Sequence, residues 1–147
     1  MTRKRMSIRS ERGAALIEAA FTIPLLLLVS LLIVEFGRAF ETWQVMTNAA
    51  REGARVAVLP NATAAAVEAR VRSYLDAGVL IDVSSASVAV AGSPVSLGGT
   101  VTAPGSRVTV TYPFQFMVLG PIARLAVRGS TLGAPLTLTT QAVMRNE

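Results

Sequence analysis

The chain has 147 residues, of which 52% are hydrophobic, and it contains no His and no Cys. Its only Lys is Lys4, close to the N-terminus. This composition excludes Ser-His-Asp and Cys-His catalysis, thiolate chemistry, a lysine nucleophile in a folded site, and metal centres built on imidazole or sulfur. Of the nine acidic residues, Glu11 lies in the N-terminal tail, Glu18 in an apolar run and Glu147 at the last position, and the other six are scattered, most at positions typical of a helix surface. We therefore predict no enzyme activity, no cofactor, no metal and no small-molecule substrate.

The net charge of +5 is concentrated at the N-terminus. Residues 1–13 carry five basic side chains and one acidic one, whereas residues 35–147 are close to balance. No Arg-rich stripe with interleaved aromatic residues follows, although such a stripe is typical of nucleic-acid binding. The pattern predicts a basic cytoplasmic leader, residues 1–13, and no nucleic-acid partner.

An apolar run of 21 residues follows, from Ala14 to Val34, with Glu18 as its one charged residue. A helix of this length spans about 30 Å, the thickness of the hydrocarbon core of a bilayer. A removable signal peptide is the alternative, but its apolar region is shorter, and Gly37-Arg38-Ala39 resembles its cleavage site poorly. Because basic residues beside a first span stay in the cytoplasm, we predict one transmembrane helix, residues 14–34, with the C-terminal domain outside.

Two residues interrupt the apolar character of this run. Pro24 lacks a backbone donor and is expected to weaken or kink the helix. A carboxylate such as that of Glu18 costs roughly 2.5–3.5 kcal/mol within the bilayer on insertion scales, and therefore indicates a function. The alternative is that Glu18 lies close enough to the cytoplasmic face to reach water.

The order and spacing of short motifs from residue 11 to residue 58 resemble the TadE-like family, the pseudopilins of tight-adherence (type IVc) pilus systems. The matching pieces are RGAALIE at residues 12–18, PLLLL at 24–28, EFGR at 35–38 and NAAREGAR at 48–55. The closing AVMRNE at 142–147 is similar to the usual ending of the family. The rest of the chain resembles the family only in general character.

The resemblance implies that a membrane prepilin peptidase cuts between Gly13 and Ala14. Cleavage would free the α-amino group of Ala14, one helical turn before Glu18. The Glu18 carboxylate could then meet the amine of a neighbouring subunit, which would offset the insertion cost and set the axial stagger of packed helices. Glu18 is therefore the predicted assembly residue. The predicted subunit-packing residues are Phe21, Pro24, Phe36, Phe40 and Trp43.

The helix is expected to continue beyond the bilayer as a stem, residues 35–59, and to end at Pro60. Apolar residues recur there mostly three or four positions apart, which predicts an apolar stripe. The stripe consists of Phe36, Ala39, Phe40, Trp43, Met46, Ala50 and Ala54. We expect most of it to pack against the protein's own head, whereas its three aromatic residues could instead anchor the stem at the membrane interface.

Residues 60–147 are predicted to form an extracytoplasmic head. A second helix is expected from about residue 62 to Ala77, with Asn61 or Thr63 as its cap and Gly78 at its end. Alternating apolar and polar residues predict strands, over 83–91, 107–113 and 136–145. Segment 92–105 has turn signals, and segment 114–126 is expected to be a short helix or an apolar loop near the membrane.

The sequence therefore predicts an α+β, lollipop-like fold: a long transmembrane helix with its stem, a second helix and about three antiparallel strands. The predicted function is that of a minor pilin or pseudopilin, a structural subunit of a pilus used in adhesion or of a related secretion filament. Its expected partners are the bacterial inner membrane, the prepilin peptidase, other pilins or pseudopilins and the pilus assembly platform. The alternative is an uncleaved single-pass protein whose external domain binds a ligand or a partner.

Overall fold

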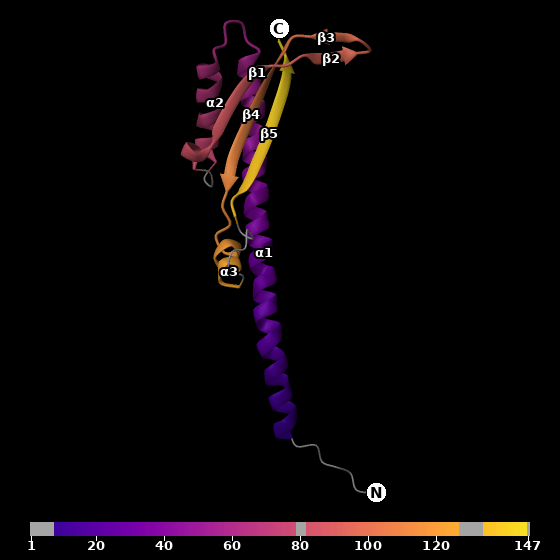
Figure 1. Ribbon diagram of the computed structural model, residues 1–147, viewed down its shortest axis with the longest axis vertical. Helices are drawn as coiled ribbons and strands as arrows, with labels where there is room; N and C mark the ends of the chain where they lie inside the picture. Colours follow the sequence, from indigo (N-terminus) through magenta and orange to yellow (C-terminus); the bar gives the residue numbers. More distant parts are fainter. Residues whose placement is uncertain (1–7, 79–81, 127–133, 147) are drawn as a thin grey trace.

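The structure is a computed structural model that describes residues 8–78, 82–126 and 134–146. Its main element is helix α1, Ile8–Ala57, whose 50 residues extend over about 75 Å. The N-terminal half of α1 projects away from the rest of the molecule, and the head packs along the C-terminal half (Figure 1). This is the predicted lollipop-like arrangement.

Helix α1 runs through Pro24 without interruption, so the expected weakening does not break the helix. It ends at Ala57, three residues before Pro60, the residue at which the end was predicted. The backbone N–H of Leu59 then donates to the carbonyl of Val56 at 3.1 Å. This bond closes the first turn after the helix.

Helix α2, Ala64–Ala77, lies beside the C-terminal part of α1 (Figure 1). The Thr63 hydroxyl accepts from the backbone N–H of Ala66 at 3.2 Å, which is the capping geometry predicted for this residue. At the other end, the N–H of Gly78 donates to the carbonyl of Leu75 at 3.0 Å. Asn61, the other candidate cap, instead adopts a φ of 62° in the preceding turn.

The head contains a three-stranded antiparallel sheet in the order β1-β4-β5. Its strands are β1, Ser87–Gly92, β4, Gly105–Phe114, and β5, Leu136–Arg145. The central strand pairs Val108 with Val90 of β1 and with Ala142 of β5. The three predicted strands and the α+β class are confirmed.

The first predicted strand, 83–91, begins four residues too early. Residues Val83–Ser85 form a 3-10 turn, η1. The Asp82 carboxylate accepts from the backbone N–H of Ser84 at 3.0 Å and from the hydroxyls of Ser84 and Ser85 at 2.7 and 3.0 Å. Such local side-chain bonds offer the backbone an alternative to a strand, and they outweigh the alternating pattern here.

Segment 92–105 also differs from the prediction, because it holds more than turns. Strands β2, Val95–Gly98, and β3, Val101–Ala103, form a hairpin that projects sideways from the head (Figure 1). The turn itself was correctly indicated by Gly98 and Gly99, whose φ values are 111° and 59°. Strands of four and three residues are too short to give a clear alternating pattern.

The hydrophobic core lies where α1, α2 and the sheet meet. Its central residues are Met46, Ala50 and Ala54 from α1, Val67, Val71 and Leu75 from α2, and Val108 and Val110 from β4. The C-terminal part of the predicted stripe, from Met46 to Ala54, is thus confirmed to pack in the core of the head. Its aromatic residues are not buried: Phe36, Phe40 and Trp43 are 58%, 58% and 42% exposed.

Between β4 and β5 the chain forms a short helix, α3, Leu119–Ala126. Figure 1 shows α3 beside α1, on the side of the sheet that faces the projecting half of the long helix. The prediction of a short helix in segment 114–126 is confirmed. Whether it lies near the membrane depends on the position of the span.

Candidate functional site

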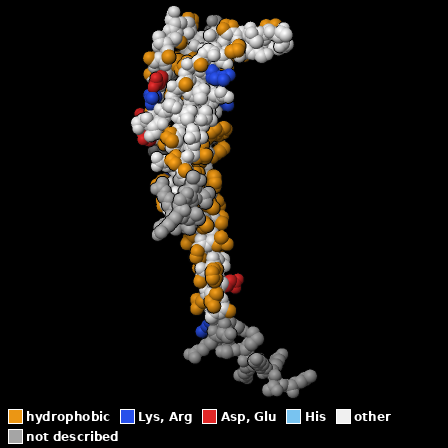
Figure 2. All heavy atoms as spheres, in the orientation of Figure 1, with side chains coloured by type: hydrophobic (Ala, Val, Ile, Leu, Met, Phe, Trp, Pro, Cys, Tyr) orange, Lys and Arg blue, Asp and Glu red, His pale blue; other side chains and the backbone are white. Residues whose placement is uncertain are grey.

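The projecting half of α1 has a surface made almost entirely of large apolar side chains. No residue in its most apolar 18-residue window is buried, and the helix is long and apolar enough to cross a membrane. Leu16, Phe21 and Ile33 are 72%, 77% and 67% exposed. Figure 2 shows this apolar shaft, interrupted by an acidic side chain, below the head. Because the window is exposed, it is not the core helix of a soluble domain.

The predicted cleavage residues, Gly13 and Ala14, both lie within α1. A Cβ atom added to Gly13 would meet nothing within 4 Å, so the surroundings of this residue are open. The backbone is nevertheless helical there, starting at Ile8. A protease that binds an extended backbone would therefore have to unwind the first turns of the helix.

The carboxylate of Glu18 is exposed on the apolar shaft, one helical turn beyond Ala14. Within one chain, the two positions are about 6 Å apart along the helix axis. The structure thus places Ala14 and Glu18 on the same helix face. It is the face on which an amine at Ala14 and the carboxylate would both be available to a neighbouring helix.

The predicted packing residues divide into two groups along the shaft. Phe21 and Pro24 lie in the apolar run and are exposed. Phe40 and Trp43 form an exposed pair nearer the head, with ring centroids 6.1 Å apart. Phe36 instead contacts Phe116 of the head edge-on, with centroids 6.3 Å apart. All five remain candidates for contact with lipid or with another helix.

Sequence reasoning gave no role to Glu35, which joins the long helix to the head in the structure. Glu35, at the end of the apolar run, is 2% exposed. Its carboxylate accepts from the backbone N–H of Met117, at 3.1 and 3.0 Å from its two oxygens, and from that of Val118 at 3.2 Å. The expectation of a helix-surface position is therefore wrong for Glu35.

Arg38 completes the junction around Glu35. Its Nη1 atom lies 3.5 Å from Oε1 of Glu35, and its guanidinium lies over the ring of Phe114, 5.6 Å from the centroid. The only sequence signal of this junction was the charged motif EFGR at the end of the span. A buried or interfacial acid needs a partner, and Arg38 in this motif is one candidate. The motif contains no signal for the other partners, the backbone N–H groups of residues 117 and 118.

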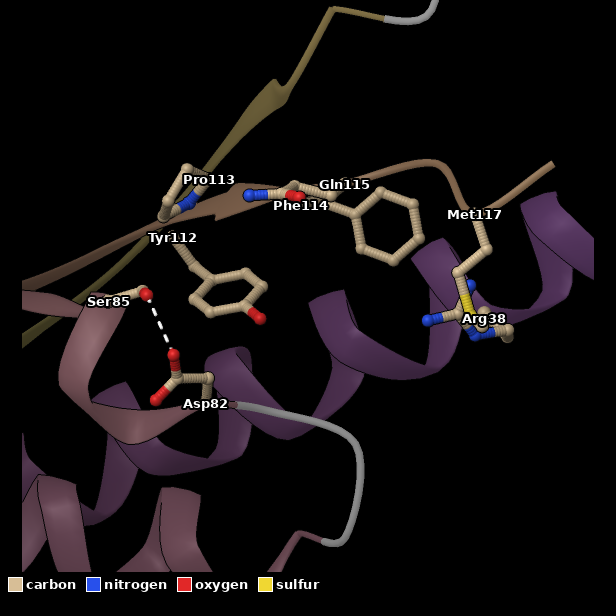
Figure 3. Close-up of a pocket in the computed structure, with 8 residues that line it drawn as sticks. All are labelled: Arg38, Asp82, Ser85, Tyr112, Pro113, Phe114, Gln115 and Met117. Carbon is tan, nitrogen blue, oxygen red and sulfur yellow. Dashed lines mark hydrogen bonds between the residues drawn. The ribbon is translucent and has the colours of Figure 1, made fainter. Parts of the chain in front are cut away.

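A hollow of about 270 Å³ lies beside this junction, between Arg38 on one wall and Asp82 on another (Figure 3). The hydrogen bonds from Ser84 and Ser85 hold the pKa of Asp82 below its usual range. Arg38, the other charged group of the hollow, is ion-paired with Glu35 at 3.5 Å, although its buried Nη1 atom makes no hydrogen bond. The hollow holds no pair of free acid and base groups, and we assign it no chemistry.

A second ion pair joins the two helices of the head. Nη2 of Arg70 in α2 donates to Oε1 of Glu52 in α1 at 2.6 Å, and Nη1 of Arg55 lies 3.7 Å from Oε2 of Glu52. The hydrogen bond from Arg70, with the charges of Arg70 and Arg55, lowers the pKa of Glu52 from its ordinary value. This contact is structural, because it fixes α2 against α1.

An exposed apolar helix of this length, joined to a small α+β head, defines a single-pass, membrane-anchored protein. Residues 13–55 match the family model described as TadE-like protein. The resemblance indicated by the motifs is thereby confirmed over these residues, which make up less than half of the chain. Neither a curated protein nor a solved structure matches the chain.

Proposed function

We propose that this protein is a minor pilin or pseudopilin of a tight-adherence (type IVc) pilus or a related secretion filament. In this role it is a structural subunit whose leader is removed by a prepilin peptidase. The observation that carries the proposal is the exposed apolar shaft with Glu18 one turn beyond the Gly13–Ala14 bond. The family match begins at residue 13, the last residue of the proposed leader.

The proposal divides the chain into four functional parts. Residues 1–13 are the basic leader in the cytoplasm, residues 14–34 span the bacterial inner membrane, residues 35–59 form the stem and residues 60–147 form the head outside. The basic leader sets this orientation, because Lys and Arg beside a first span are retained in the cytoplasm. The peptidase acts on the cytoplasmic side, where the exposed start of α1 leaves the membrane.

The chemistry of assembly depends on the charge of Glu18. A carboxylate in hydrocarbon is unfavourable by itself, and a cationic partner offsets this cost. Cleavage creates such a partner, the α-amino group of Ala14, at the end of every mature chain. Pairing between Glu18 of one subunit and Ala14 of the next fixes the axial offset of two helices. The exposed side chains of Phe21, Pro24 and the Phe40–Trp43 pair then supply the contact area.

The test is affinity capture of the C-terminally tagged chain from membranes of cells that carry the peptidase and the pilus proteins. We expect a captured chain that begins at Ala14, together with other pilins or pseudopilins and proteins of the assembly platform. Glu18→Ala should remain in the membrane but lose these partners. Glu41→Ala, at an exposed position of the same helix, is the matched control and should retain them.

Two outcomes would count against the proposal. Capture of the same partners by Glu18→Ala would remove the role of Glu18. A chain that keeps residues 1–13 and captures no pilin would instead favour an uncleaved membrane protein whose head binds another partner.

A further inference from the structure

The start of the short helix α3 lies against the apolar run of α1. A narrow seam between the two helices is lined by Leu28, Leu31 and Leu32 of α1 and by Val118, Leu119 and Ile122. Glu35 lines the seam as well, and the other α1 residues that line it belong to residues 14–34, the proposed membrane span. Any surface that covers Leu28 to Leu32 lies at the same depth as these residues.

The depth follows from the geometry of the helix. Leu28 precedes Val34, the last residue of the apolar run, by six positions, or about 9 Å along the axis. The hydrocarbon layer is about 30 Å thick. If the span ends at Val34, the part of α3 that contacts Leu28 lies within the leaflet nearest the head.

A chain segment at this depth must satisfy its own backbone groups, because hydrocarbon offers no hydrogen-bond partner. At the start of α3 the structure provides acceptors for three of these backbone N–H groups. The Glu35 carboxylate accepts from the N–H groups of Met117 and Val118, and the N–H of Ile122 donates to the carbonyl of Val118 at 3.2 Å. Pro121, in the first turn, has no N–H to satisfy. The buried carboxylate of Glu35 thus allows the non-helical residues that precede α3 to lie beside the span.

The outward side of this segment is apolar. Met117 is 66% exposed and Ile122 is 38% exposed, and Phe36 on α1, at the level of Glu35, is also exposed. Leu31 of the span, which lines the same seam, is 39% exposed.

We propose that α3 is a second membrane contact, inserted in the leaflet nearest the head, and that lipid acyl chains cover its outward side. Glu35 is then a positioning residue that holds α3 beside the span. The head is consequently attached to the bilayer at two elements, α1 and α3, which restricts its tilt before assembly. This inference requires that α1 spans a membrane, but it is independent of cleavage and of filament formation.

The test uses the full, uncleaved chain in vesicles of phosphatidylcholine and phosphatidylglycerol at a low protein-to-lipid ratio. Since the chain has no Cys, one fluorophore can be attached at Ile122→Cys, Leu31→Cys or Leu97→Cys. Leu31 is the span reference, and Leu97, 52% exposed in the β2–β3 hairpin, is the control outside the membrane. Lipids with nitroxides on the acyl chain quench only probes in the hydrocarbon, and iodide quenches only probes in water.

We expect nitroxide quenching at position 122 to be similar to that at position 31 and about tenfold stronger than at position 97, because the nitroxides stay in the hydrocarbon layer. Met117→Cys provides a second probe on the same surface, should Ile122→Cys fail to fold. Quenching by iodide at position 122, with none by nitroxide, would overturn the proposal. Protection from both quenchers would show that a second protein chain covers this surface, and would overturn it as well.

Discussion

The carboxylate of Glu35 and the backbone N–H of Met117 are hydrogen-bonded although 82 positions separate them in the sequence. The bond joins the end of the apolar run to the segment that leads from β4 into α3. It explains why an acidic residue is buried at the junction between shaft and head: its charge is neutralised by backbone donors and by Arg38, 3.5 Å away. The head is therefore fixed to the helix at its lower edge as well as through its core.

Replacement of Glu35 by Ala should loosen this edge. The N–H groups of Met117 and Val118 would lose a charged acceptor in a buried setting, which costs about 3 kcal/mol and corresponds to about a hundredfold faster local opening. Hydrogen exchange of residues 115–118 in detergent micelles or vesicles measures this. Glu35→Gln should lose less of this protection from exchange, because its amide oxygen can still accept a hydrogen bond from these N–H groups. Glu41→Ala, at an exposed position, should exchange like the unaltered chain, and equal protection in Glu35→Ala would refute the assigned role.

The contact between α1 and α2 depends on the absence of a side chain at Gly53. A Cβ atom there would overlap with Cγ2 of Val71 and lie 3.3 Å from Cγ1 of Val108. Val71 cannot easily turn away, because a β-branched side chain in a helix has one preferred rotamer. We expect Gly53→Ala to destabilise the head by about 1–3 kcal/mol, as measured by hydrogen exchange of strand β4.

Gly37→Ala is the matched control for this substitution, since it makes the same change in the same helix. A Cβ atom at Gly37 would meet nothing within 4 Å, and Ala favours a helix over Gly by about 1 kcal/mol. The head should therefore keep its stability in Gly37→Ala. Equal effects of the two substitutions would show that Gly53 has no special packing role.

The pH dependence of the α1–α2 contact follows from the Glu52–Arg70 pair. The hydrogen bond from Arg70 lowers the pKa of Glu52 below its ordinary value of 4.5. A carboxyl whose pKa is lower in the folded state stabilises the fold above the unfolded pKa, and this contribution is lost as the pH falls through the folded value. The contact should thus be intact at neutral pH and weaken at pH values below 4.5.

Titration of the Glu52 side-chain carboxyl by NMR measures this shift. Arg70→Gln should raise the pKa of Glu52 toward 4.5, because Arg55 alone remains near the carboxylate. Arg72→Gln removes a similar residue of α2 that pairs with Glu68 at 2.8 Å and should leave the pKa of Glu52 unchanged. An unchanged pKa in Arg70→Gln would contradict the assigned cause.

Local patterns in the sequence were enough to predict the main elements. The apolar run and stripe predicted one long helix, Thr63 and Gly78 bounded α2 within two residues, and alternation gave β5 its bounds, Leu136–Arg145. These signals are local, since caps and periodicity depend on neighbours in the chain. The same reasoning placed the start of the first strand too early, at residue 83. The hydrogen bonds that Asp82 accepts from two serines favour a turn where the alternation favours a strand.

The candidate site could be predicted only in part, and for a physical reason. Gly13, Ala14 and Glu18 form a local motif, and their roles remain predictions that the fold does not test. The partners of Glu35 come from the other end of the chain, and the space beside Gly53 depends on α2 and β4. No pattern within a single segment contains such contacts, so they emerge only when the elements are packed.

The most direct test of the central claim is the intact mass of the chain extracted from membranes of cells with an active prepilin peptidase. We expect the mass to lack residues 1–13, so that the chain begins at Ala14 with a free amine one turn before Glu18. Cells without the peptidase should yield the full mass. A chain that still begins at Met1 in the presence of the active peptidase would contradict the account.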